Sequence, residues 1–235
     1  MTSATVENAV WANGEGGVPA LAEPRTGYWI VRDPSGRLAQ DAPVLAAYLG
    51  PGERAALHHL RPPARRARAL GRIAGKDAVC RWLADRGAPV GAPRSVRICN
   101  DRGGRPRVVV AGREPVRISL AHCRSVAVAA VAPMDAGVDV EVVEPRGTVF
   151  ARLALSEREL RLGEALDPDE WVTRAWTIKE AVAKAAGTGL RGRPKDFVVH
   201  ELDGDWAFAS GRWVRTAREG HMMVSTVHQH RTGDA

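Results

Sequence analysis

The chain has 235 residues, of which 45% are hydrophobic and 26% charged, a composition typical of a folded globular protein with one large domain or two small ones. No apolar run approaches the roughly 20 residues that a membrane-spanning helix needs, and the N-terminus lacks the layout of a signal peptide, so we expect a cytoplasmic protein with no membrane partner. The three widely spaced cysteines fit neither a disulfide framework nor a zinc site, and a net charge of +7 favours polyanionic partners.

The first part of the chain predicts a strand, three helices and then a group of strands. Residues 1–24 have no periodicity, and we expect a flexible leader. Aromatic and β-branched residues predict the first strand at Gly27–Arg32. Short helices are expected at Val44–Leu49 and Glu53–Leu60, and a long helix at Ala64–Arg86. Four strands should follow, at Ser95–Cys99, Arg107–Val110, Val116–Leu120 and Ser125–Val131.

The second part repeats this order. A strand is expected at Val138–Val143, then helices at Val149–Leu155 and Pro168–Ala186, with a capping box formed by Ser156 and Glu159 between them. The last strands are expected at Phe197–Leu202, Trp206–Ala209, Trp213–Ala217 and His221–Val227.

The repeated order predicts an α+β fold made of two similar α/β halves related by a pseudo-twofold axis. Each half should be a small antiparallel sheet packed on a long helix, with the active site in the cleft between the halves. We place the N-terminal half at residues 25–135 and the C-terminal half at residues 136–228. Residues 229–235 are expected to form a flexible tail.

Two carboxylates share one face of the strand that opens the second half. Residues two apart on a strand point the same way, so Asp139 and Glu141 lie side by side while Val138 and Val140 pack behind them. Adjacent carboxylates repel unless a cation lies between them, and Mg²⁺ prefers such ligands. The alternative is a solvent-facing edge of an amphipathic strand.

The helix at 168–186 carries charges along one face. Helical spacing aligns Trp176, Glu180, Lys184 and Gly187, where a plain amphipathic helix would be apolar. Glu180 and Lys184 could form a simple ion pair one turn apart, or face a site. Glu180 could then supply a third carboxylate.

Basic and polar residues in the first half favour an anionic ligand. The loop residues Gly104, Arg105 and Pro106, together with His122 at a strand end, form a candidate cradle for phosphate. The helix at 64–86 contains most of a basic run between Arg61 and Arg81. This run could contact an anionic partner or face solvent.

In combination, these motifs resemble a known family. Gly137-Val138-Asp139-Val140-Glu141, followed by Trp-x-x-Lys-Glu-Ala-x-x-Lys-x-x-Gly-x-Gly-Leu at residues 176–190, resembles the paired signature of the 4′-phosphopantetheinyl transferases, in their two-half, Sfp-type form. Gly104-Arg105-Pro106 is similar to the G-K-P element of that family, with arginine where lysine is usual. The segment Ser119–Cys123 is similar to its S-H-[ST] element, with Cys123 where a hydroxyl is common.

The resemblance implies an enzyme that transfers the 4′-phosphopantetheine arm of coenzyme A to a serine of an acyl or peptidyl carrier protein and releases adenosine 3′,5′-bisphosphate. It implies that Mg²⁺, or Mn²⁺, is held by Asp139, Glu141 and Glu180. Glu180 or a metal-bound water would be the base, and Lys184 would offset charge on the departing phosphate. Coenzyme A would be bound by Arg54, at its 3′-phosphate, and by Gly104, Arg105, Pro106, His122 and Lys184.

The same residues are compatible with other functions. A nucleic-acid-binding module could use the Arg61–Arg81 run, although no recognition motif or aromatic stacking pattern accompanies it. A Mg²⁺-dependent nuclease or phosphatase could use the same carboxylates. Because two internal halves can form a cleft without a second subunit, we expect a monomer with no nucleic-acid partner.

Overall fold

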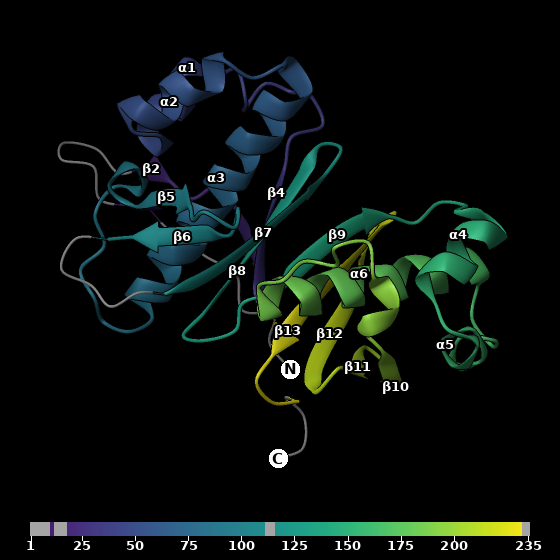
Figure 1. The fold of residues 1–235 in the computed structure, drawn as a ribbon. Helices are drawn as coiled ribbons and strands as arrows, with labels where there is room; N and C mark the ends of the chain where they lie inside the picture. The colour runs from purple at the N-terminus through teal and green to yellow at the C-terminus, as the bar shows by residue number, and fades with distance from the viewer. Residues whose placement is uncertain (1–9, 12–17, 111–115, 232–235) are drawn as a thin grey trace.

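The chain folds into two large antiparallel sheets, each packed against one long helix (Figure 1). The structure, a computed structural model, describes residues 10–11, 18–110 and 116–231. It confirms the α+β class and the two similar halves. Residues 1–9, 12–17 and 232–235 of the expected leader and tail lie outside the described residues. Residues 10–11 and 18–19 form the two-stranded sheet of β1 (Val10–Trp11) and β2 (Val18–Pro19).

The first half is a six-stranded sheet with its helices on one side. The strand order is β3 (Glu23–Arg25), β4 (Tyr28–Arg32), β8 (Val126–Ala132), β7 (Arg117–Cys123), β6 (Pro106–Val109) and β5 (Arg97–Asn100). Its helices are α1 (Ala42–Tyr48), α2 (Pro51–His58), α3 (Pro62–Ala84) and a 3-10 turn at Pro93–Ser95. Helix α3 begins at Pro62, two residues earlier than expected, because proline loses no hydrogen bond in the first helical turn.

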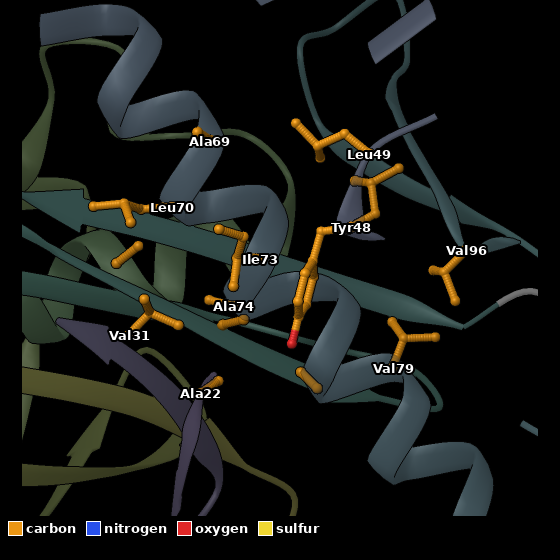
Figure 2. Packing of buried hydrophobic residues seen from close by; sticks show 14 of the residues in the cluster. Ala22, Val31, Tyr48, Leu49, Ala69, Leu70, Ile73, Ala74, Val79 and Val96 are labelled. Carbon is orange, nitrogen blue, oxygen red and sulfur yellow. The ribbon is translucent and has the colours of Figure 1, made fainter. Parts of the chain in front are cut away.

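Helix α3 is the centre of the first core. The side chains of Ala69, Ile73, Lys76 and Cys80 are fully buried along one face of this helix. Figure 2 shows the ring of Tyr48 lying along α3 between Ala74 and Val79.

The chain preceding β3 is attached to α3, although residues 1–24 were expected to be flexible. One carboxylate oxygen of buried Asp77 accepts hydrogen bonds from the backbone N–H groups of Leu21 (2.9 Å) and Ala22 (2.8 Å). The other accepts the hydroxyl of Tyr48 at 2.9 Å. A buried carboxylate needs such donors, and the sequence alone does not show which segment provides them.

The second half is a five-stranded sheet covered by α6 (Pro168–Ala186) on one face. The strand order is β10 (Val199–Asp203), β11 (Trp206–Ala209), β12 (Arg212–Glu219), β13 (Met222–His228) and β9 (Val138–Val142). Two short helices, α4 (Gly147–Ala154) and α5 (Glu157–Leu162), lead into α6, and a 3-10 turn at Pro194–Asp196 follows it. The predicted capping box of Ser156 and Glu159 starts α5.

The halves meet through the faces of their sheets that the long helices leave free. Side chains of β4, β7 and β8, among them Tyr28 and Ile30, form one buried cluster with side chains of β9 and β13. The hydroxyl of Ser119 on β7 accepts the N–H of Val138 on β9 at 3.1 Å. At the edge of this junction, the hydroxyl of Tyr28 donates to Glu219 at 2.9 Å, so the orientation of the halves is defined by apolar packing and by polar contacts.

None of the described helices is long and apolar enough to span a membrane.

Candidate functional site

Strand β9 turns its two carboxylates toward α6. Its alternation places Val138, Val140 and Val142 in the core between the sheets, so Asp139 and Glu141 point to the opposite face. Asp139 is 6% exposed, and its Oδ1 lies 2.6 Å from Nζ of Lys184. The same ammonium donates to the carbonyl of Val138 at 3.2 Å. Lys184 therefore contacts β9, and among the described residues it forms no ion pair with Glu180 of its own helix.

The surroundings of Asp139 disfavour its ionised form. Burial raises the pKa of its carboxyl to about 6, because Lys184 offsets only part of the cost and the nearby charges of Glu180 and Glu141 add to it. Its second oxygen, Oδ2, is buried and has no hydrogen-bond partner among the described residues. A buried, unpaired carboxylate oxygen favours an additional cation or proton.

Glu180 completes a group of three interacting carboxylates. It is half-buried on α6, and its carboxylate has no hydrogen bond or ion pair within the described part of the chain. Burial, and to a lesser extent the charge of Glu141, raises the pKa of Glu180 in spite of Lys184. Glu141 itself is paired with Arg146 at 3.0 Å. Glu180 therefore lies close enough to the β9 carboxylates for their charges to affect one another.

The three carboxylates do not form a closed set of metal ligands in this conformation. Among the described residues, no three His, Cys, Asp or Glu side chains lie close enough together to hold one ion. The physical reason is that Lys184 and Arg146 each hold one carboxylate of β9. The expected convergence of Asp139, Glu141 and Glu180 on one cation-sized space is therefore not met by these side-chain positions.

Helix α6 is fixed by contacts that the sequence did not reveal. Lys179, next to Glu180, turns away from the site and forms a fully buried ion pair with Glu159 at 2.7 Å. Trp176 packs on Phe150 of α4 with ring centroids 5.1 Å apart. At Gly137, a Cβ would collide with the backbone carbonyl of Ala181, so only glycine lets the start of β9 approach α6 this closely.

A cavity of about 370 Å³ lies between the halves beside this carboxylate group. It is bordered by the 103–107 loop and β7 of the first half, and by Lys184 and the 187–191 loop of the second. The guanidinium of Arg105 crosses it and occupies the space that a Cβ on Gly187 would fill. The structure thus brings Gly104, Arg105, Pro106 and Lys184 together, as predicted.

A second cavity, of about 420 Å³, adjoins the first and shares Gly104, Pro106 and Leu120 with it. Its wall includes His122 and two arginines of α3, Arg68 and Arg72. Arg72 is 6% exposed, and its guanidinium donates to Asn100 at 3.3 Å. The cavity is therefore basic and suits an anionic ligand.

Most other residues of the basic run form hydrogen bonds or ion pairs with groups of the first half. Arg65 donates to backbone carbonyls of the α2 end, Arg66 to the carbonyl of Asp33, and fully buried Lys76 pairs with Glu53 at 2.5 Å. Arg81 pairs with Asp85 one turn on. The run is not a single exposed basic face.

Arg54 is separated from the other predicted residues. It lies on α2, donates to the carbonyl of Leu49 at 3.0 Å, and lines neither cavity. The second cavity is lined by Arg68 and Arg72 and not by Arg54. They belong to the basic run noted in the sequence, but the periodicity of a helix rich in Ala and Arg did not show which arginines face inward.

Comparison with known proteins supports the site assignment in the second half. Residues 135–228 match the family model of the 4′-phosphopantetheinyl transferase superfamily. The comparison with curated proteins finds no match.

Two solved structures show local likeness to this chain. A holo-(acyl-carrier-protein) synthase from Bacillus anthracis, solved with CoA (3′,5′-ADP), is 21% identical, with a TM-score of 0.37 over 45% of this chain and 90% of that one. The holo-[acyl-carrier-protein] synthase of Thermotoga maritima is 28% identical, with a TM-score of 0.36 over 43% of this chain and 66% of that one. Because both TM-scores are low, the assignment depends on the family match.

Proposed function

Because residues 135–228 match the family model of the 4′-phosphopantetheinyl transferase superfamily, we propose that this chain transfers the phosphopantetheine arm of coenzyme A to a serine of an acyl or peptidyl carrier protein. The observation that carries the proposal is the position of Lys184. It joins the carboxylate group at Asp139 to a basic cavity that both halves line. Phosphoryl transfer needs such a junction between a proton acceptor and a phosphate-binding surface.

Coenzyme A has two anionic groups, and the two adjoining cavities provide two groups of cations. Arg105 and Lys184 would hold the diphosphate, where the reaction takes place. Arg68, Arg72 and His122 would hold the nucleotide side in the adjoining cavity. In this proposal Arg54 has no direct contact with coenzyme A.

The transfer step is a displacement at the β-phosphorus of coenzyme A. The serine hydroxyl of the carrier forms the new P–O bond, and the bond from that phosphorus to the bridging oxygen breaks, so adenosine 3′,5′-bisphosphate leaves. Glu180 accepts the serine proton, for which its raised pKa and unpaired carboxylate are suited. Lys184 offsets the charge that develops on the leaving phosphate.

The residues present fit a divalent cation in their chemistry. Asp139, Glu141 and Glu180 are three mutually repelling carboxylates, and Asp139 Oδ2 is buried without a partner among the described residues. These residues would hold Mg²⁺, and Lys184 and Arg146 would release Asp139 and Glu141 to it. When bound, the ion would neutralise charge on the diphosphate.

A panel of apo carrier proteins tests the proposed function. The protein, coenzyme A and Mg²⁺ are incubated with apo carriers of fatty acid, polyketide and nonribosomal peptide synthesis, and each carrier is weighed by mass spectrometry. We expect one phosphopantetheine arm on at least one carrier and an equal amount of adenosine 3′,5′-bisphosphate. Release of the bisphosphate without carrier would instead support hydrolysis.

We further propose that the protein is a monomer, because both walls of the cavity beside Lys184 come from one chain. We also propose a cytoplasmic location. For nucleic-acid binding the structure offers little support, since most arginines of the Arg61–Arg81 run are engaged within the first half.

A further inference from the structure

Two arginines stand directly opposite each other on neighbouring strands of the first sheet. Arg107 of β6 and Arg117 of β7 are cross-strand partners, and both side chains are exposed. Neither guanidinium has a hydrogen bond or ion pair with another described residue. Like charges in this arrangement destabilise a sheet, so the pair is explained most simply by an anion that binds across it.

The pair borders the cavity between the halves. Arg191, from the loop after α6, lines the same cavity and is also exposed. Its backbone is left-handed (φ 50°), and its Nε donates to the carbonyl of Thr188 at 3.0 Å, which holds the side chain close to this loop. A left-handed backbone is unfavourable for a residue with a Cβ, so this conformation of Arg191 must be held by its surroundings.

These three residues, which we call the rim arginines, differ from the inner cations of the same cavity. Arg105 lies against Gly187 and Lys184 against Asp139, and both are half-buried. The rim arginines are exposed. Asp101 is the one acidic residue of the described lining, and its Oδ1 already accepts the N–H groups of Gly103 and Arg105.

The position and exposure of the rim arginines favour a protein anion over a phosphate of coenzyme A. The inner cations and the α3 arginines already match the two phosphate groups of the cofactor. In the proposed reaction, the serine of the carrier must reach the diphosphate beside Lys184, so the surface around that serine must cover the mouth of the cavity. Exposed guanidinium groups at an interface rim attract carboxylates and speed association.

We propose that Arg107, Arg117 and Arg191 dock an acidic segment of the carrier protein next to its acceptor serine. The inference rests on the proposed function and names the partner surface of the same site. It places carrier recognition on strands β6 and β7 of the first sheet and on the 187–191 loop, apart from the carboxylates that perform the chemistry.

The test compares Arg107→Glu/Arg117→Glu with the wild type. Binding of a fluorescently labelled, acidic apo acyl carrier protein is measured by anisotropy without coenzyme A, and KM values are measured for carrier and for coenzyme A. We expect carrier binding to weaken about tenfold and the KM for carrier to rise equally, with the KM for coenzyme A unchanged. High salt should reduce the difference, since exposed charges are screened over about 8–10 Å.

Arg97→Glu is the matched control, because Arg97 is exposed on the neighbouring strand β5 and does not line the cavity. It should change carrier binding less than about twofold. If the charge-reversed variant does not fold, Arg107→Gln/Arg117→Gln decides the question, with an expected weakening of about threefold.

Unchanged carrier binding in a folded variant would overturn the proposal, as would an equal loss in the Arg97 control or a wild type that does not bind the acidic carrier. A rise in the KM for coenzyme A alone would assign the pair to the cofactor instead. Wild-type protein that binds the carrier in the expected manner but transfers nothing would contradict the proposed function and leave the docking surface supported.

Discussion

The guanidinium of Arg105, from a loop of the first half, lies directly against Gly187, the C-cap of α6 in the second half. The contact joins the two walls of the cavity beside Lys184. It also explains the glycine at this position in two ways, because residue 187 has a left-handed backbone (φ 73°) and no room for a Cβ unless Arg105 moves.

Gly187→Ala should therefore displace Arg105 and raise the KM for coenzyme A several-fold. The control is Gly189→Ala, which has the same kind of backbone (φ 62°) but nothing within 4 Å of an added Cβ. Both variants should lose about 1 kcal/mol of stability from the left-handed backbone, while the KM changes only in the first. Equal KM values in the two variants would show that the Arg105 contact does not matter for binding.

Gly137→Ala should destabilise the second half strongly. An added Cβ would collide with the carbonyl of Ala181 and press on Ala185 (2.9 Å), and overpacking of this kind costs about 1–3 kcal/mol. Gly52→Ala, in an exposed helical position with nothing within 4 Å, should instead stabilise by about 0.5–1 kcal/mol. Urea denaturation of both variants checks the prediction, and a Gly137 variant as stable as the wild type would contradict the close approach.

Asp139→Asn should make the protein more stable at neutral pH while reducing transfer. Burial raises the pKa of Asp139 from 3.8 to about 6 in the folded protein. The folded protein is therefore most stable, as far as this carboxyl is concerned, below about pH 4, and it loses stability as the pH rises through 6. Measured at pH 8 with EDTA present, the variant should gain about 3 kcal/mol. The gain should disappear as the pH falls to 4. A loss of stability at pH 8 would mean that Lys184 more than compensates the burial.

Lys179→Met should cost about 3–5 kcal/mol, because it leaves the charge of Glu159 buried and uncompensated. Both partners are fully buried at 2.7 Å. The exposed pair of Arg218 and Glu170 at 2.6 Å provides the control, and Arg218→Ala should cost under about 1 kcal/mol. Thermal melts of the two variants make the comparison, and similar losses would contradict it.

The same pair predicts a loss of stability in acid. Burial opposes ionisation of Glu159, but hydrogen bonds from Lys179, Ser156 and Val199 outweigh it, so its pKa is lowered in the folded protein. A lowered carboxyl pKa gives stability that is present above the unfolded value and lost as the pH falls below about 4.5. In the Lys179→Met variant this acid-induced loss should be smaller, because there is less stabilisation to remove.

The sequence predicted the elements well because their signals are local. Helix α6 begins at Pro168 and ends before Gly187 as expected, since a proline start and a glycine C-cap are encoded within a few residues. The alternation of Val138 to Val142 likewise placed Asp139 and Glu141 on one face.

The partners of charged side chains depend on tertiary packing and could not be predicted in the same way. Lys179 and Glu180 are adjacent, yet a turn of about 100° sends one into a buried pair with α5 and the other toward β9. In the basic run, the direction of each arginine depends on how α3 meets the sheet. The periodicity of α3 therefore did not show that Arg68 and Arg72 line the cavity. The family resemblance implied Arg54 for the 3′-phosphate, and this residue lies on α2 away from both cavities.

The central claim is that Glu180 is the proton acceptor in a transfer reaction, and one time course tests it directly. Wild type, Glu180→Gln and Glu170→Gln are each incubated with coenzyme A, Mg²⁺ and an apo carrier, and the carrier mass is followed over time. Glu170 lies on the same helix in an exposed ion pair, so its variant controls for the lost charge. We predict transfer by the wild type and Glu170→Gln, and a rate at least about a hundredfold lower for Glu180→Gln. Transfer by folded Glu180→Gln at the wild-type rate would contradict the account.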